Sequence, residues 1–349
     1  MERRSTKAVT IGDVQIGGSA PVSVQSMTNT DTRNVAETVQ QIKELADAGC
    51  ELIRVAIPDH EAAAKVDKIK AKINIPLIAD IHFDHQLALE VLERGIDGLR
   101  INPGNIGGAE QVKAVAQKAL AEDVPIRVGV NGGSLEKRLL EKYGHPTAEA
   151  MVESALHNIE LLEKYNFEDI IISLKASEVP MTLKAYQLMA QEVDYPLHVG
   201  ITEAGTVKSG TIKSAVGIGS ILAQGLGDTI RVSLTGNPVE EIGVAYDILK
   251  SLNLRDKGAN IISCPTCGRC EIDLVEIANR VEEEISGVDK AVEVAIMGCV
   301  VNGPGEAREA DIGIAGGKEE GLIFKDGEPL RKVASEELVA ELVEEIKKL

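Results

Sequence analysis

Short apolar runs and longer amphipathic segments alternate along the first 250 or so residues. The apolar runs predict strands at residues 22–27, 52–57, 77–81, 99–102, 126–130, 170–174, 197–201 and 229–234. Helical periodicity between them predicts helices at residues 34–48, 60–72, 85–94, 109–121, 147–164, 181–193, 208–224 and 238–252. Apolar strands separated by helices are typical of a parallel sheet covered on its outer face. Eight such units predict a (β/α)8 TIM barrel.

An open, doubly wound sheet is the structural alternative for the same alternation. No Gly-x-Gly-x-x-Gly turn follows the first of these strands, which disfavours a dinucleotide-binding version of that fold. Before the alternation begins, two short apolar segments at 9–11 and 14–16 flank Gly12-Asp13. This pattern predicts a β-hairpin.

The pattern changes after about residue 254 and predicts a second, smaller α/β domain. Strands are expected at 260–263, 292–297, 312–315 and 322–324, with a helical stripe over 272–285 and a last helix capped by Ser335. The predicted domains are therefore a barrel at 1–254 and a smaller domain at 255–349.

Composition and charge narrow the possible functions. The 349 residues carry a net charge of −18 with 2% aromatic residues, which argues against general nucleic-acid binding. No apolar run approaches the ~20 residues that span a bilayer, and the polar N-terminus has no signal-peptide core. We therefore expect a cytoplasmic protein without membrane segments. Five cysteines in such a chain are typical of metal-binding or catalytic sites more than of disulfides.

Cationic residues recur in or just after the predicted barrel strands. They are Arg54, Arg100, Arg127, Lys175 and Arg231. Side chains at the carboxyl ends of barrel strands face the active site. Each cation alone could pair with an acidic neighbour, but together they predict a phosphate or diphosphate ligand held by arginine forks and a lysine. Ser233 could add a hydroxyl donor.

Three further polar residues are candidates for a catalytic role at the same strand ends. Glu203 lies in Gly200-Ile201-Thr202-Glu203-Ala204-Gly205, where a carboxyl group could donate or accept a proton, although a loop glutamate can also be a solvated surface residue. His82 could position a substrate hydroxyl or phosphate, or make a local packing contact. Asn131 follows the fifth strand.

The C-terminal cysteines have the spacing of a metal site. Cys264-Pro265-Thr266-Cys267 can bind one metal centre from a single turn, and Cys299 could join it from a distant strand end. The last histidine of the chain is His198, so the fourth ligand is left open between Cys270, an external molecule and a carboxylate such as Glu306. An oxygen ligand on a thiolate site exchanges readily, which favours a reactive iron–sulfur cluster over a structural zinc site.

Cys267 and Cys270 form a second Cys-x-x-Cys pair, but Cys270 falls at the start of the following predicted helix. We therefore favour Cys264, Cys267 and Cys299 as the ligands. Cys50 follows a helix end and is expected to be a buried small hydrophobe.

Long motifs then suggest a family. They are VQSMTNT at 24–30, RINPG at 100–104, GITEAG at 200–205, DTIRVSLT at 228–235, SCPTC at 263–267 and MGCVVNGPGE at 297–306. With these motifs the chain resembles the bacterial 4-hydroxy-3-methylbut-2-enyl diphosphate synthase family of the methylerythritol phosphate pathway, and the resemblance covers almost the whole chain.

The resemblance implies a TIM barrel followed by an iron–sulfur domain similar to those of sulfite and nitrite reductases. It implies a [4Fe-4S] cluster held by Cys264, Cys267, Cys299 and Glu306. It also implies that Glu203 is the catalytic carboxylate, that His82 and Asn131 line the site, and that the diphosphate is bound by Arg54, Arg100, Arg127, Lys175, Arg231 and Ser233.

The implied reaction converts 2-C-methyl-D-erythritol 2,4-cyclodiphosphate into (E)-4-hydroxy-3-methylbut-2-enyl diphosphate with two electrons, as a step of isoprenoid biosynthesis. Ferredoxin or flavodoxin is the expected electron donor. The expected assembly is a homodimer in which the barrel of one subunit faces the cluster domain of the other. Two alternatives remain at this point: a barrel enzyme for another phosphorylated substrate with a structural zinc site, and a non-enzymatic iron–sulfur electron carrier.

Overall fold

The chain divides into two compact units, Met1–Arg255 and Asp256–Leu349, each with its own hydrophobic core. The structure is a computed structural model that describes residues 2–102, 104–255, 258–285, 288, 290–299 and 310–349. Within these ranges no helix is both long and apolar enough to cross a lipid bilayer.

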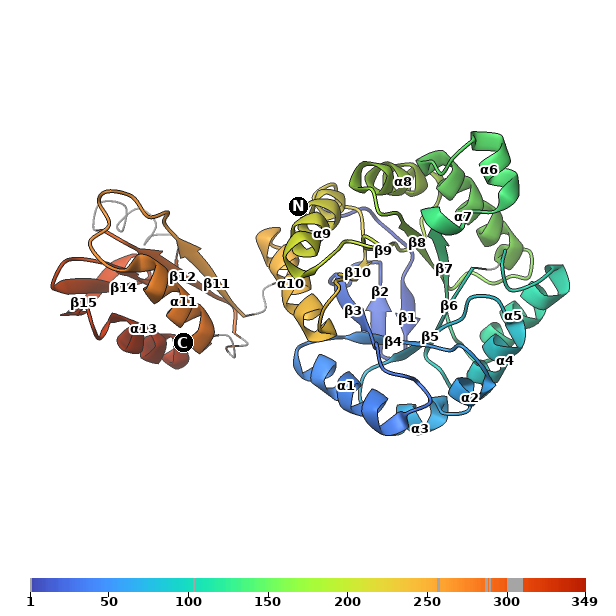
Figure 1. Cartoon of the computed structure of the whole chain (residues 1–349), viewed down its shortest axis with the longest axis horizontal. Coiled ribbons are helices and arrows are strands. Elements are labelled where there is room, and N and C mark those ends of the chain that lie inside the picture. Colours follow the sequence, from blue (N-terminus) through green and yellow to red (C-terminus); the bar gives the residue numbers. More distant parts are fainter. Residues whose placement is uncertain (1, 103, 256–257, 286–287, 289, 300–309) are drawn as a thin grey trace. The chain divides into compact units, whose positions relative to one another are not determined.

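The first unit is a barrel of parallel strands (Figure 1). The neighbour order is β8-β7-β6-β5-β4-β3-β10-β9, and a parallel bridge between Ile172 and Leu197 closes the ring. The strands are β3 (Ser23–Met27), β4 (Leu52–Ala56), β5 (Leu77–Asp80), β6 (Gly98–Ile101), β7 (Ile126–Asn131), β8 (Ile170–Lys175), β9 (His198–Val199) and β10 (Thr229–Ile230). The TIM-barrel prediction is confirmed, and the doubly wound alternative is wrong.

The helices of this unit surround the barrel (Figure 1). They are α1 (Val35–Asp47), α2 (His60–Ala63), α3 (Val66–Lys70), α4 (His85–Glu93), α5 (Ala109–Ala121), α6 (Lys137–Tyr143), α7 (Ala148–Glu163), α8 (Val179–Glu192), α9 (Val207–Leu222) and α10 (Pro238–Ser251). The single helix expected at 60–72 is wrong, because α2 ends at Ala63 and α3 starts at Val66. No glycine or proline marks this break in the sequence.

A β-hairpin covers the amino-terminal end of the barrel. β1 (Val9–Ile11) pairs antiparallel with β2 (Val14–Ile16) around Gly12, whose φ of +60° suits a residue without a side chain. Its apolar residues pack with Leu52, Ile78 and Ile171, which lie at or near the first residues of three strands. Since the hairpin fills this end, a ligand site is left to the carboxyl ends of the strands.

The second unit is a mixed sheet with the order β11-β12-β13-β14-β15. β11 (Ala259–Ser263), β12 (Val292–Met297) and β13 (Ile312–Ala315) run parallel, and β14 (Glu320–Lys325) and β15 (Glu328–Ala334) continue the sheet antiparallel. Helices α11 (Leu274–Ile285) and α13 (Leu338–Lys348) share one core with the sheet. Ser335 does not cap the last helix as expected, because its hydroxyl donates to the carbonyl of Gly317.

Candidate active site

The five predicted cations come together inside the barrel, from strand positions that range from the second residue of β7 (Arg127) to the last residue of β8 (Lys175). Arg127 and Lys175 are buried, and the side chains of Arg54, Arg100 and Arg231 are 11%, 8% and 16% exposed. Their mutual repulsion is felt at Lys175, where burial and then the charges of the four arginines lower the lysine pKa well below its ordinary value. The five cations predicted from the sequence therefore form one positively charged cluster in a chain whose net charge is strongly negative.

A buried carboxylate, Asp80, balances one side of this cluster. Its Oδ1 lies 3.1 Å from Nη1 of Arg100, and its Oδ2 lies 3.6 Å from Nε of Arg54. His82 reaches the same carboxylate at 3.6 Å, with a side chain that is 56% exposed. Burial alone would raise the pKa of Asp80, but Arg54, the hydrogen bond from His82 and Arg100 hold it well below its usual range.

A second buried carboxylate, Glu241 in the first turn of α10, lies on the Arg231 side. Its Oε2 accepts from the hydroxyl of Ser26 at 3.1 Å and lies 3.8 Å from Nε of Arg231. Its Oε1 accepts from the backbone N–H of Leu234 at 2.9 Å. Burial raises the pKa of Glu241, and Arg231 opposes this only in part. Glu241 thus ties α10 to β3 and to the loop that carries Ser233.

Arg127 and Lys175 have only neutral partners. Arg127 Nη1 donates to Oε1 of Gln25 at 2.5 Å, while its Nε and Nη2 make no hydrogen bond to any described residue. Lys175 Nζ lies 3.3 Å from Nε2 of His198. No carboxylate of the described residues lies within 4 Å of either cation. An unpaired buried guanidinium is costly, so this part of the cluster is prepared for an anion.

Two glycines leave the space that the cations occupy. A Cβ at Gly129 in β7 would lie 2.5 Å from Nε of Arg100, and a Cβ at Gly200 would lie 2.8 Å from Nζ of Lys175. Any side chain at either position would displace a cation. Neither glycine carries a signal of this role in the sequence.

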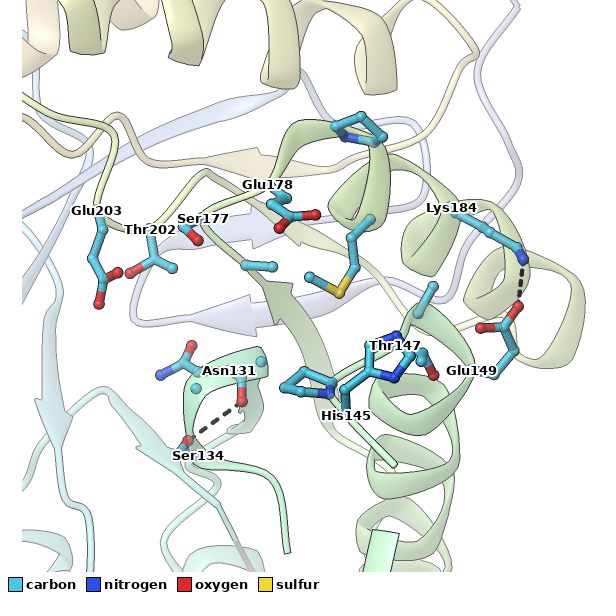
Figure 2. A pocket seen from close by; sticks show the side chains of 17 residues that line it. Asn131, Ser134, His145, Thr147, Glu149, Ser177, Glu178, Lys184, Thr202 and Glu203 are labelled. Atoms are coloured by element: carbon cyan, nitrogen blue, oxygen red, sulfur yellow. Dashed lines mark hydrogen bonds and ion pairs between the residues drawn. The ribbon is translucent and has the colours of Figure 1, made fainter. Parts of the chain in front are cut away.

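An adjacent pocket of about 840 Å³ contains two of the three predicted catalytic residues (Figure 2). Glu203 and Asn131 lie at one end of it, and Lys184 and Glu149 form an ion pair at the other. Glu203 is exposed and has a φ of +53°, a left-handed conformation that costs a residue with a side chain about 1 kcal/mol or more. His82 does not line this pocket and lies with Asp80 and Arg100 instead.

The sequence predicted Ser233 as a site residue but did not point to Glu241. Ser233 is partly exposed two residues after Arg231, as expected from the motif. Glu241 was missed, although it precedes Ala245 and Leu249 by four and eight residues on the buried face of α10. A carboxylate on an apolar helix face is the signal that would have found it.

In the second unit, two of the predicted metal-binding cysteines follow neighbouring parallel strands. Cys264 comes directly after β11, and Cys299 comes two residues after β12, which pairs with β11 in parallel. The backbone N–H of Gly298 donates to Sγ of Cys264 at 3.3 Å. Cys267 is exposed on the turn after Cys264. Glu306 lies outside the described residues.

Cys270 lies against the same strand end. Its Sγ donates to the carbonyl of Ile272 at 3.2 Å and would lie 2.5 Å from a Cβ at Gly298. Within the described residues no group of three histidine, cysteine or acidic side chains is close enough to hold a metal ion. The donor chemistry nevertheless fits a metal cluster, because thiolates at adjacent strand ends are soft ligands and no histidine is nearby in sequence to complete a zinc site.

Comparison with known proteins covers both units. The family described as GcpE TIM-barrel domain matches residues 6–246, and the GcpE protein C-terminal domain matches residues 260–348. A protein of Geobacter sulfurreducens named 4-hydroxy-3-methylbut-2-en-1-yl diphosphate synthase (flavodoxin) is 60% identical over 347 residues, covering 99% of this chain and 98% of its own length. A protein of the same name from Ruminiclostridium cellulolyticum is 57% identical over 349 residues, covering 100% of this chain and 99% of its own.

Among solved structures, the Yersinia pestis dihydropteroate synthase superposes on 71% of this chain and 100% of its own with a TM-score of 0.52. At 14% sequence identity this similarity concerns the fold alone. The two domain matches and the full-length relatives agree with the motif-based resemblance. This chain belongs to the GcpE family, whose relatives matched here are named 4-hydroxy-3-methylbut-2-en-1-yl diphosphate synthases.

Proposed function

We propose that this chain catalyses the two-electron reductive ring opening and dehydroxylation of 2-C-methyl-D-erythritol 2,4-cyclodiphosphate to (E)-4-hydroxy-3-methylbut-2-enyl diphosphate, in isoprenoid biosynthesis. The observation that carries the proposal is the cluster of buried cations at the barrel mouth, in a chain 60% identical to a synthase of that name. In this proposal residues 1–254 bind the substrate and residues 255–349 hold the redox centre.

The charges of the barrel mouth suit both substrate and product. Five cations face two buried carboxylates, Asp80 and Glu241, so the cluster has three positive charges in excess when Lys175 is protonated. A cyclic diphosphate carries two negative charges, and opening the ring creates a third on the diphosphate. Fixed cations that meet a charge as it develops lower the barrier to its formation. Arg127 and Lys175, which lack carboxylate partners, are the expected first contacts, and Ser233 adds a hydroxyl donor.

The dehydroxylation needs a proton as well as electrons, since the hydroxyl group leaves as water. Glu203 is the proposed proton donor, because it lines the pocket next to the mouth, where its carboxyl group can reach a ligand, and its backbone holds a strained left-handed conformation of the kind that clusters at functional sites. Asn131 faces the same pocket and can orient the substrate through its amide. His82 contacts both Asp80 and Arg100, and from this position it can contact a phosphate or hydroxyl group of the substrate.

The proposed redox centre is a [4Fe-4S] cluster bound by Cys264, Cys267, Cys299 and Glu306. When bound, the cluster supplies electrons one at a time and accepts them from flavodoxin, the donor in the relatives' names, or from ferredoxin. The N–H of Gly298 stabilises the Cys264 thiolate by a hydrogen bond. Such thiols stay reduced in the cytoplasm, which is the proposed location.

The proposed assembly is a homodimer in which the cluster-bearing unit of one chain faces the barrel of the other. Mixing two inactive variants, Glu203→Gln and Cys264→Ser, tests it. Heterodimers would contain one site with both intact halves, so activity should return to about a quarter of the wild-type level after subunit exchange. If each chain uses its own two units, mixing restores nothing.

The decisive experiment is an anaerobic assay of the cyclic diphosphate with dithionite and a mediator, together with electron paramagnetic resonance and metal analysis. The proposal predicts turnover, about four irons per chain with labile sulfide, and loss of turnover in Glu203→Gln with the cluster retained. One zinc without sulfide would favour a phosphate-binding barrel with a structural metal. A cluster without turnover would favour an electron carrier.

A further inference from the structure

His198 is the first residue of β9 and contacts Lys175 of the cation cluster. It is not one of the residues assigned above to substrate binding or catalysis. It is 0% exposed, and its Nε2 lies 3.3 Å from Nζ of Lys175. We infer that His198 is a positioning residue, whose neutral imidazole accepts a hydrogen bond from the Lys175 ammonium and aims it at the diphosphate. The inference rests on the proposed function, because it assigns Lys175 to the diphosphate.

The surroundings of His198 specify its tautomer. Its Nδ1 lies 3.4 Å from Oγ1 of Thr229. If Nε2 accepts from the Lys175 ammonium, Nδ1 must carry the proton and donate it to Thr229. Burial, and then the charges of Arg127 and Lys175, lower the pKa of His198 well below its ordinary value, so the ring stays neutral and keeps this lone pair.

The backbone at this point is held by a buried tyrosine. β8 and β9 share only the bridge between Ile172 and Leu197 within the described residues, so the ladder offers little support where Lys175 and His198 lie. The hydroxyl of Tyr186 in α8 fills the gap: it donates to the carbonyl of His198 at 2.5 Å and accepts from the N–H of Leu174 at 3.1 Å. The two strands are thereby fixed at the positions that set the Lys175–His198 distance.

Lys175 needs such an acceptor because its other neighbours repel it or leave it space. Arg231, Arg54, Arg127 and Arg100 all act on it as like charges. Gly200 has no side chain that could accept a hydrogen bond, and Nζ of Lys175 lies 2.8 Å from the position that a Cβ would occupy there. Without the acceptor at His198, the Lys175 ammonium would turn away from the other cations and would no longer contact the diphosphate.

Amide substitutions of different length provide the test. The carbonyl of a glutamine reaches the position of Nε2, whereas that of an asparagine reaches only as far as Nδ1. Binding of the cyclic diphosphate without reductant is measured by calorimetry for wild type, His198→Gln, His198→Asn and, as a matched control on the exposed face of α7, His157→Leu. His198→Gln and the control should bind within about threefold of wild type, and His198→Asn should bind about tenfold or more weakly, the cost of a hydrogen bond to a charged group.

A double-mutant cycle separates positioning from general damage to the fold. In a Lys175→Met background, His198→Asn should weaken binding by less than about twofold, because the group it positions is gone. Equal affinity of the Gln and Asn variants, or an undiminished effect in the Lys175→Met background, overturns the inference. If the Asn variant does not fold, ¹⁵N NMR of histidine-labelled wild type decides: the Nδ1–H tautomer supports the inference and the Nε2–H tautomer overturns it. Wild type that fails to bind the cyclic diphosphate refutes the proposed function instead.

Discussion

Oδ1 of Asp80 lies 3.1 Å from Nη1 of Arg100 inside the barrel mouth. Both side chains are less than 10% exposed, so this is a buried ion pair in a region of excess positive charge. Arg54 shares the same carboxylate at 3.6 Å. Asp80 therefore holds two of the predicted diphosphate-binding arginines in place before any ligand arrives.

Replacing Asp80 with Asn should destabilise the ligand-free protein by about 3 kcal/mol, because two buried guanidinium groups lose their counter-charge. The cyclic diphosphate should restore part of this loss, since its charges replace the missing carboxylate. Thermal denaturation with and without the ligand measures both effects. The ligand-induced rise in Tm should be larger in Asp80→Asn than in wild type.

The ion pair of the exposed Asp67 with the half-buried Arg94, 3.8 Å apart, provides the control. Asp67→Asn should change stability by less than about 1 kcal/mol. Because the folded-state pKa of Asp80 is depressed, its stabilisation is present above the unfolded-state pKa of about 4 and is lost as pH falls toward the folded-state value. The difference between wild type and Asp80→Asn should accordingly shrink below about pH 4, and a constant difference would contradict this account.

Binding of the cyclic diphosphate should depend on pH through the titration of Lys175. Burial and the neighbouring arginines lower the pKa of Lys175 in the ligand-free protein, whereas a bound anion raises it. Between the two values, binding takes up a proton, and affinity falls as pH rises, by up to about tenfold per unit. Calorimetry in buffers of different ionisation enthalpy measures this proton.

Lys175→Met should remove the proton uptake of the lysine and flatten the profile at pH values where Arg54 and Arg127 stay charged; burial lowers the pKa of both arginines. Glu203→Gln is the comparison variant, since Glu203 lines the neighbouring pocket and should leave the proton uptake in place. An unchanged pH profile in Lys175→Met would assign the titration to another group.

The sequence was sufficient for the barrel because short, largely apolar strand segments alternate regularly with helices that carry apolar stripes. It failed where elements are short or exposed. α6 has seven residues and one buried side chain, Leu139, so it leaves little periodic pattern. β15 is mostly exposed at the sheet edge and is held by backbone pairing with β14 after the turn at Asp326, so its apolar pattern is weak.

For the site, a position in or just after a barrel strand was enough to select the five cations, because inward-facing side chains of a closed barrel share one interior. Lys175 ends β8 and Arg231 follows β10, whereas Arg127 is only the second residue of β7. Their partners were harder to find, since each contact depends on the packing of a distant element. Glu241 comes from α10 and reaches Ser26 across 215 positions of sequence. Glycines that leave space for a cation, such as Gly129, carry no chemical signal of their own.

Gly129→Ala tests whether the space beside Arg100 matters for binding. The new Cβ would lie 2.5 Å from Nε and 2.8 Å from Nη2 of Arg100, so the guanidinium group must move, and affinity for the cyclic diphosphate should fall about tenfold. The matched control is Gly243→Ala on the exposed face of α10, where the new Cβ would meet no atom within 4 Å beyond its chain neighbours and the local helix backbone. This control should gain up to about 1 kcal/mol of stability and bind normally.

Gly298→Ala tests the packing of the cysteine region. Its Cβ would lie 2.5 Å from Sγ of Cys270, so one of them must move, and Gly298 also donates to Sγ of Cys264. We expect Gly298→Ala to lower the iron content of anaerobically purified protein.

Cys270→Ala should retain the cluster, because Cys270 donates to the carbonyl of Ile272 and is not a proposed ligand. The double variant Gly298→Ala/Cys270→Ala should recover iron content, because removal of Sγ makes room for the new methyl group. Iron and sulfide analysis of wild type, the two single variants and the double variant measures this compensation. If Cys270→Ala alone loses the cluster as fully as Cys264→Ala, then Cys270 is a ligand, and the double variant will stay empty because a missing thiolate cannot be replaced by space.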